Sequence, residues 1–285
     1  MANSIIELHN VSYRYASGTL ALDSVNLVIP KGKKIALIGG NGAGKSTLML
    51  LLNGIIRPTN GHLSFESVKY GYKKSQLRKL RSKIGLIFSD SDNQLIAPTV
   101  YEEISFGLNN ISKDEKWVRA RVEETLDAFS LNDLSEKPTH ELSTGQKKRV
   151  CMAAVLAMAP EVIVSDEPAS GLDPWYEKNM FGYLDRLHQE GKTIIISTHD
   201  VNQAYSWADH VIVLYNGKIL LCGTSKDVFS RRDVIEKTGL NLPFIVEASY
   251  ALKPEIEPSE LPSDMKTFYN MLETENKLRE AKENM

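Results

Sequence analysis

The sequence is poor in cysteine and has no long hydrophobic run. Its only two cysteines, Cys151 and Cys222, stand far apart and outside any metal-ligand spacing, which favours reduced thiols of a cytosolic protein over a disulfide framework. No apolar stretch approaches the roughly 18 residues of a membrane-spanning helix. The amino terminus, MANSIIELHN, has neither the basic start nor the apolar core of a signal peptide. We therefore expect any contact with a membrane to be made through partner proteins.

Neither sign of charge is in excess. The net charge is −2, which provides no basic footprint for nucleic acid. The six histidines form no pair at metal-ligand spacing, so we expect no structural metal. With 285 residues, of which 25% are charged and 42% hydrophobic, the chain has the composition of a soluble globular protein of one large domain or two.

Glycine, in contrast, is concentrated in the stretch GGNGAGKST, which fits the phosphate-binding pattern G-x-x-x-x-G-K-[ST]. Its glycines permit backbone conformations that are closed to residues with a Cβ, so that successive N–H groups turn toward phosphate oxygens. A buried strand over 34–38 and a helix over 46–53 flank the stretch and would place an anion at a helix N-terminus. We predict a nucleotide-binding loop made of Gly39, Gly40, Asn41, Gly42, Ala43, Gly44, Lys45, Ser46 and Thr47, with Lys45 on the β- and γ-phosphates and Ser46 as a ligand of Mg²⁺.

Two further segments carry groups suited to the chemistry of a bound nucleotide. Residues 162–167 (VIVSDE) read as a buried strand that ends in two carboxylates. Behind a phosphate loop, Asp166 is placed to hold Mg²⁺ through water and Glu167 to polarise the attacking water. Residues 142–146 (LSTGQ) precede a helix, which makes them either a second anion site at its positive end or an ordinary helix cap.

The remaining pattern predicts an α/β fold. Buried strands over 84–88, 162–165 and 193–197 alternate with helices, as in a parallel sheet covered on both faces. An alternating strand over 5–15 pairs with residues 27–29, and a short strand covers 62–65. From a cap at Thr99 to about His140 the pattern is that of an amphipathic helix, with a core stripe of Trp117, Val118, Val122, Leu126 and Phe129.

Two segments each allow two interpretations. Residues 69–83 hold seven Lys or Arg and no acid, which indicates either a solvated helix face or proximity to an anionic surface. From about residue 229 prolines become frequent, and a charged helix over 264–282 follows. This tail is either a partly disordered extension or an element that holds two subunits together without nucleotide. The narrow apolar stripe of its helix is Met265, Phe268, Leu272 and Leu278.

Together these motifs resemble the ATP-binding cassette (ABC) ATPases over residues 5–230. LSTGQ matches the family signature, IVSDEP over 163–168 the second Walker motif, SGLD over 170–173 the D-loop and STHD over 197–200 the switch-histidine segment. The resemblance implies a P-loop NTPase core with an antiparallel β subdomain, an inserted helical subdomain over about 89–142, an ATPase domain over 1–228 and a C-terminal extension over 229–285.

The resemblance also implies how the residues act. Two subunits would pair head to tail, so that each ATP lies between one phosphate loop and the signature residues Ser143, Gly145 and Gln146 of the other subunit. Mg²⁺ would be held by Ser46 and Asp166. Tyr15 would stack on adenine, although an aromatic residue in that strand also fits the core. The catalytic residues would be Glu167, His199 and Lys45, with His199 on the γ-phosphate.

A narrower resemblance is to the ATPases of energy-coupling-factor importers, especially the cobalt/nickel type. It rests on four segments: VSYRYASGTLAL (11–22), SDSDNQLIAPTVYEEISFGLNN (89–110), LSTGQKKRV (142–150), and GTSKDVF (223–229) with the tail. It implies an ATP-hydrolysing subunit on the cytoplasmic face of the cell membrane that powers import of cobalt, nickel or a vitamin. Its partners would be a second ATPase subunit, identical or different, an integral membrane coupling protein docked beside residues 89–101, and a substrate-binding membrane subunit.

Two other functions were weighed against import. A soluble ABC ATPase acting on DNA or ribosomes usually has two fused cassettes or a long coiled-coil insertion, and this chain has neither, nor a basic excess. A non-hydrolysing subunit is disfavoured because Lys45, Asp166, Glu167 and His199 are all present.

Three positions depart from the family pattern. Ser89 stands where the Q-loop glutamine is expected, Thr144 replaces a glycine of the signature, and Ser165 puts a hydroxyl in a strand that is normally apolar. We expect the changes at Thr144 and Ser165 to be tolerated. A serine at position 89 would reach Mg²⁺ only if the loop moved inward or through a bridging water, which predicts slow hydrolysis with normal ATP binding. Gln94 is a candidate substitute.

Overall fold

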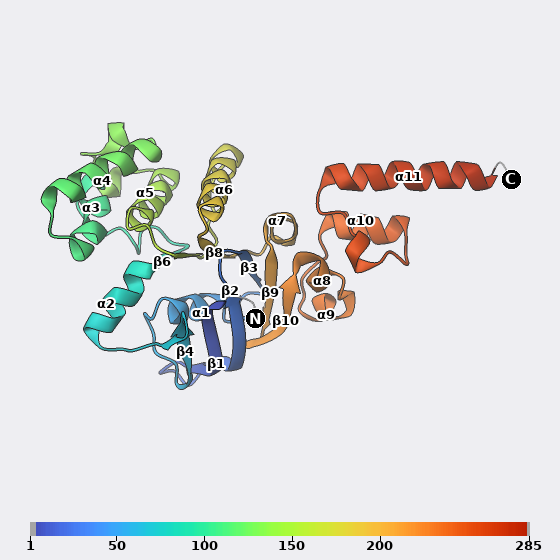
Figure 1. Ribbon diagram of the computed structural model, residues 1–285, viewed down its shortest axis with the longest axis horizontal. Helices are drawn as coiled ribbons and strands as arrows, with labels where there is room; N and C mark the ends of the chain where they lie inside the picture. The colour runs from blue at the N-terminus through green and yellow to red at the C-terminus, as the bar shows by residue number, and fades with distance from the viewer. Residues whose placement is uncertain (1–3, 284–285) are drawn as a thin grey trace.

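The computed structural model describes the backbone of residues 4–283 and the side chains of residues 4–277. Two sheets and a block of helices form the body, and a helical tail extends from it (Figure 1). The strands are β1 (Ser4–Arg14), β2 (Leu20–Pro30), β3 (Lys34–Ile38), β4 (Asn60–Phe65), β5 (Val68–Lys69), β6 (Ile84–Ile87), β7 (Val162–Ser165), β8 (Thr193–Ser197), β9 (His210–Tyr215) and β10 (Lys218–Thr224). The helices are α1 (Lys45–Leu52), α2 (Lys74–Lys83), α3 (Val100–Ile111), α4 (Glu115–Ala128), α5 (Thr144–Leu156), α6 (Pro174–Gln189), α7 (Val201–Trp207), α8 (Ser225–Phe229), α9 (Arg232–Lys237), α10 (Phe244–Leu252) and α11 (Met265–Glu283), with short 3-10 turns at 132–134, 139–141 and 258–260.

The N-terminal sheet is antiparallel, as predicted. Its strand order is β2-β1-β4-β5, and β1 pairs with β2 along most of its length, from Ser4 opposite Pro30 to Arg14 opposite Leu20. The hairpin partner is therefore longer than the three residues predicted. Apolar side chains of this sheet share one buried core with α1 and with alternate residues of the second sheet.

The second sheet positions the loops that carry the predicted site residues. Its order is β10-β9-β3-β8-β7-β6, and the five strands from β9 to β6 run parallel. Strand β3 lies between β8 and β9, with Lys34 opposite Ile194 and Ile35 opposite His210. The loops that leave β3, β6, β7 and β8 therefore meet at one edge, the usual place for ligands in an open α/β sheet.

The hairpin of β9 and β10 was not predicted. Asn216 and Gly217 connect the two strands with φ values of 47° and 75°. An Asn-Gly pair between apolar runs is the strongest short-range hairpin signal, so the sequence contained the information needed to find it.

The helical block corrects one prediction. A continuous pattern from Thr99 to about His140 is wrong, because α3 ends at Ile111 and Asp114 caps a new helix by accepting hydrogen bonds from the N–H groups of Lys116 and Trp117. Trp117 is also wrong as a core residue, since it is 43% exposed, whereas Val118, Val122 and Leu126 are buried.

Two other features of the block follow the sequence more closely. Thr99 does cap α3. The buried cluster of the block includes Val150, Ala153 and Ala157, so it continues through α5, beyond the predicted limit near residue 142. Helix α2 has the exposed basic side chains of a solvated helix, and only its Leu80 is buried.

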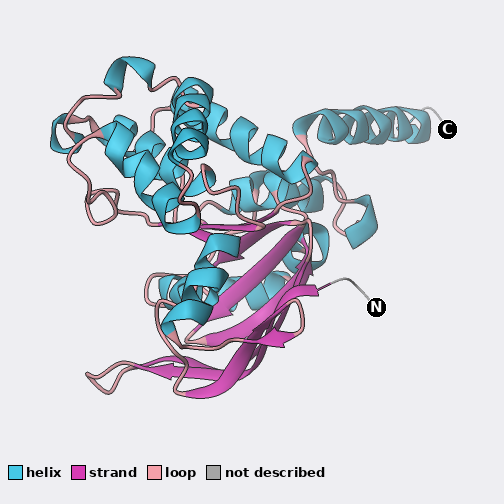
Figure 2. Cartoon of the chain, turned by 60° about the vertical axis from the view of Figure 1, so that its left-hand side comes forward, coloured by secondary structure: helices cyan, strands magenta, loops and turns pink. Residues whose placement is uncertain are grey.

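The tail has two parts. Residues through Pro262 pack on the body of the protein: Phe229, Ile235 and Val246 are fully buried in the same cluster as β8 and α7, and the Tyr205 hydroxyl donates to the Pro262 carbonyl at 2.9 Å. Beyond them α11 projects away from the body (Figures 1 and 2).

The apolar stripe predicted for α11 is only partly present. Met265 is 52% exposed, Phe268 and Leu272 are half-buried, and Leu278 lies outside the residues whose side chains are described. Met271, which was not predicted, packs against the core. Within the described residues, no helix is both long and apolar enough to span a bilayer.

Candidate nucleotide site

The phosphate loop leaves the end of β3 through backbone conformations that glycine makes possible. Gly39, Gly42 and Gly44 have φ values of 155°, 76° and 109°, in the region that the sequence pattern requires. A Cβ on Gly39 would lie 2.2 Å from the Leu214 carbonyl oxygen, and one on Gly44 would lie 2.6 Å from that of Ala21. Neighbouring strands therefore require glycine at two of these positions.

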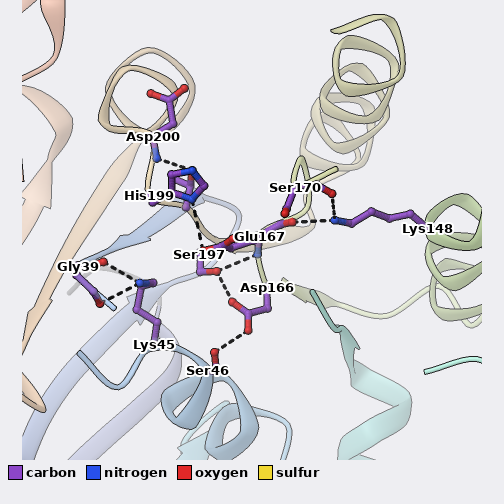
Figure 3. A network of polar contacts seen from close by, with 12 residues as sticks. Gly39, Lys45, Ser46, Lys148, Asp166, Glu167, Ser170, Ser197, His199 and Asp200 are labelled. Carbon is purple, nitrogen blue, oxygen red and sulfur yellow. Dashed lines mark hydrogen bonds and ion pairs between the residues drawn. The ribbon is translucent and has the colours of Figure 1, made fainter. Parts of the chain in front are cut away.

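Lys45 lies inside the loop and is 8% exposed. Its ammonium donates to the Gly39 carbonyl at 2.7 Å and to the Gly40 carbonyl at 3.2 Å (Figure 3). The positive charge is therefore held at two carbonyls of the loop, and Lys45 itself begins α1, at a helix N-terminus, where an anion is favoured.

Ser46 and Asp166 meet across the site. The Ser46 hydroxyl donates to Asp166 Oδ2 at 2.7 Å. A hydroxyl and a carboxylate are the oxygen donors that Mg²⁺ prefers, and this ion commonly binds one or two protein groups while phosphates and water complete its shell. No cluster of three or more His, Cys, Asp or Glu that could hold a metal occurs in the described part of the chain. The residues thus fit a nucleotide-bound Mg²⁺ better than a protein-only metal site.

Ser197 joins the two carboxylate residues, and the sequence analysis missed it. Its fully buried hydroxyl donates to Asp166 Oδ1 and accepts a hydrogen bond from the Glu167 N–H at 2.9 Å. Glu167 has a φ of 44°, a conformation that is uncommon for a residue other than glycine. A hydroxyl at the end of a strand, just before the switch-histidine segment, was the available signal.

Glu167 and His199 face each other at the other side of the loop. Glu167 Oε1 lies 3.5 Å from His199 Nδ1, and the two side chains are 28% and 73% exposed. They line a cavity of about 350 Å³ together with Ser170, Gly171 and Gln203. Figure 3 shows this carboxylate and the histidine beside Ser197 and Asp166.

The signature segment forms a helix cap. The Ser143 hydroxyl accepts from the Gln146 N–H at 3.3 Å, and the Gln146 side-chain oxygen accepts from the Ser143 N–H at 2.9 Å. This is the capping-box arrangement, the geometry of the ordinary-cap alternative, and the second anion site stays a prediction. Among the interactions of the described residues, none joins Ser143, Gly145 or Gln146 to the phosphate loop, and Figure 1 places α5 and α1 in different parts of the body.

Lys148, one turn into α5, was not predicted as a site residue because a lysine after a helix cap normally points to solvent. It is 2% exposed, and its ammonium donates to the carbonyls of Glu167 at 3.0 Å and Ser170 at 2.7 Å. Burial lowers the pKa of Lys148 below its usual value. This lysine connects the signature helix to the backbone of the predicted base.

The remaining predicted residues lie near the loop in different ways. Tyr15 is 40% exposed, and its hydroxyl lies 2.8 Å from Thr47 Oγ1, so its ring lies beside the loop and outside the core. Ser89 is exposed and lines a cleft with Ser46 and Asp166. The Gln94 side-chain oxygen accepts from the Phe88 N–H at 2.8 Å, so this oxygen is already engaged.

Comparison with known proteins gives consistent similarities. The sequence profile described as "ABC transporter" matches residues 22–170. The energy-coupling factor transporter ATP-binding protein EcfA2 of Methanospirillum hungatei is 44% identical over 249 residues, which are 87% of this chain and 63% of that relative, so the chain spans less than two thirds of its length. The corresponding EcfA of Carboxydothermus hydrogenoformans is 43% identical over 86% of this chain and 90% of its own.

A solved structure has the same fold. That of cbiO1 from Clostridium perfringens, described as part of the ABC transporter complex cbiONQ, superposes with a TM-score of 0.72 at 41% identity. The match covers 87% of this chain and 99% of that one. The α/β P-loop fold predicted from the sequence is thereby confirmed.

Proposed function

The chain belongs to the ABC transporter family, and from that premise we propose that it is the ATP-binding and ATP-hydrolysing subunit of an energy-coupling-factor importer. The observation that carries the proposal is the chain of contacts from Ser46 through Asp166 and Ser197 to Glu167. It brings the phosphate loop, the acidic strand end and the switch segment to one edge of the sheet.

Each side chain then has a role that its position supports. Lys45 neutralises charge on the β- and γ-phosphates, and Tyr15 stacks on the adenine. Glu167 takes the proton of the attacking water, while His199, within 3.5 Å of that carboxylate, orients it and contacts the γ-phosphate. Mg²⁺, held by Ser46 and Asp166, supplies further charge neutralisation.

The arrangement calls for a second subunit. Ser143, Gly145 and Gln146 lie at the positive end of α5, away from their own phosphate loop, so in our proposal they complete the site of a second copy or of a related ATPase subunit. The other partners are an integral membrane coupling protein docked beside residues 89–101 and a substrate-binding membrane subunit. The complex would place this chain peripherally at the cytoplasmic face of the membrane.

The names of the relatives support the type of importer. Both curated relatives are energy-coupling factor transporter ATP-binding proteins, and the structural neighbour is part of cbiONQ. We propose cobalt, nickel or a vitamin as cargo. The residues that select it would lie on the membrane subunits.

The replacement Glu167→Gln tests the catalytic assignment. It should lower the ATPase rate by roughly 100-fold or more, the usual worth of a general base, and keep ATP bound, so that a dimer is stable on gel filtration with Mg-ATP. Lys45→Ala should instead weaken ATP binding. The control is Glu177→Gln, a carboxylate of the same cavity that bonds Gln203, which should retain activity. Hydrolysis at the parent rate in Glu167→Gln would remove Glu167 from its role.

A further inference from the structure

A second cavity lies outside the nucleotide site. It has a volume of about 260 Å³ and is enclosed by the end of α4, by α5 and by α6, the three helices above the six-stranded sheet in Figure 1. This volume is just below the lower end of the range of small-molecule sites, roughly 300 Å³. The cavity could therefore hold a molecule of one or two rings.

Aromatic side chains supply much of its wall. Phe129 and Tyr183 lie with their ring centroids 4.5 Å apart, and Trp175 packs edge-on against Tyr176 at 4.9 Å. Trp175 is 67% exposed, which leaves its indole face available at the rim. Such rings favour a planar aromatic guest, by offset stacking or edge-to-face contact.

The charged groups of the wall are all cationic. Lys148, Arg149 and Arg186 line the cavity, and no carboxylate does. None of the three forms an ion pair with a carboxylate in the described part of the chain. Of the acids near α6, Asp173 caps the helix, Glu177 bonds Gln203, and Asp185 pairs with Lys34. Glu190 and, from α4, Glu124 lie close enough to act electrostatically on Tyr183 at the wall.

Arg149 gives the most direct indication that an anionic group binds in the cavity. Its guanidinium lies over the Tyr176 ring at 5.1 Å and reaches the Phe129 and Ser130 carbonyls only at 3.5 Å. Its Nε is buried and has no hydrogen-bond partner among the residues that the structure describes. A buried donor without a partner is costly, and an anionic oxygen would satisfy it with a charge-assisted bond.

We propose that this cavity is a binding site for a small aromatic anion, in which one or two rings lie against Trp175 and Tyr176 and an acidic group bonds Arg149 and Arg186. The cavity is also connected to the proposed catalytic residues through Lys148. The stem of Lys148 forms part of the wall, and its ammonium holds the carbonyls of Glu167 and Ser170. If the proposed ATPase function holds, occupancy changes turnover through this lysine.

The binding test uses the full chain without nucleotide and the two-ring aromatic sulfonate naphthalene-1-sulfonate. Fluorescence titration should give one site per chain. Arg149→Met should weaken the binding at least tenfold and Arg186→Met several-fold. The neutral analogue 1-methylnaphthalene should bind less well, with an affinity unaffected by either replacement. Arg119→Met, which removes an exposed cation of α4 paired with Glu123, is the matched control and should leave the sulfonate affinity unchanged.

Each outcome of the binding test either supports or overturns the proposal. Unchanged sulfonate affinity in both Arg149→Met and Arg186→Met would overturn the proposal. If Arg149→Met fails to fold, as judged by circular dichroism, the exposed Arg186 decides the question alone. As a second readout, the sulfonate should change the ATPase kcat of the parent but not of Arg149→Met. Binding is measured without ATP, so a chain that proves inactive as an ATPase would contradict the proposed function and leave the cavity proposal standing.

Discussion

Ser197→Ala is the replacement that tests most directly how the site is held together. It removes one buried oxygen that donates to Asp166 and accepts from the Glu167 N–H. We expect Glu167 to relax from its φ of 44°, because the hydrogen bond that helps to hold this backbone is gone. The carboxylates would then be displaced from the attacking water and from the ligand shell of Mg²⁺.

The magnitude follows from the two lost bonds. A neutral backbone bond contributes about 1 kcal/mol and a bond to a charged group about 2 kcal/mol. Loss of both should lower the free energy of unfolding by about 3 kcal/mol, which corresponds to a Tm lower by roughly 6–12 °C in a chain of this size. Small misplacement of catalytic groups costs up to about 100-fold in rate, so kcat should fall roughly 10- to 100-fold with little change in KM.

The neighbouring strand offers a matched control. Ser165 is equally buried, and its hydroxyl has no hydrogen-bond partner, so Ser165→Ala should be neutral or stabilising. Differential scanning calorimetry and steady-state ATPase assays on both variants decide the matter. Equal Tm and kcat values for Ser197→Ala and Ser165→Ala would refute the reasoning, because the two Ser197 hydrogen bonds would then contribute to neither stability nor turnover.

Two further predictions concern the departures from the family pattern and the tail. Ser89→Gln should raise kcat several-fold, roughly 1 kcal/mol of barrier, with ATP affinity nearly unchanged, because the Gln94 oxygen is engaged by Phe88; an unchanged or lower kcat would make the serine a native adaptation. Ending the chain at Asp264 should remove α11, leave the Tm nearly unchanged and abolish dimerisation without nucleotide in sedimentation. A dimer that persists would exclude α11 as the contact, and the cut is placed there because one near 229 would also remove the buried Ile235 and Val246.

The sequence predicted best where function restricts the choice of residue. The strands over 34–38, 162–165 and 193–197 and the phosphate loop were placed correctly, because the loop needs glycine, lysine and a hydroxyl in fixed order, and buried parallel strands read as short apolar runs. The carboxylates at 166 and 167 followed from the same logic. Register then brought Asp166 to Ser46, as expected for loops leaving parallel strands at one edge.

Long-range contacts were beyond the sequence. Lys148 reads as a solvated lysine, and only the packing of α5 against β6, beside the loop that follows β7, turns it inward. Ser197 has no local signal for its two partners. The break at Asp114 was missed because the apolar periodicity continues across it. The tail was described as an extension because its frequent prolines obscured the apolar pattern of the segment that contains the buried Phe229 and Val246.

The strand order also governs when the site can form as the chain is synthesised. β3 is made early, but its neighbours β8 and β9 emerge only near the end of the ATPase domain, and Ser46 and Asp166 are 120 residues apart. The antiparallel sheet of β1, β2 and β4 can close from an early part of the chain, whereas the strand before the phosphate loop lacks one of its two neighbours until residue 215 has left the ribosome. Such distant pairing makes folding slow. A nascent chain that stops before β8 therefore carries the whole phosphate-loop sequence and still has no nucleotide site.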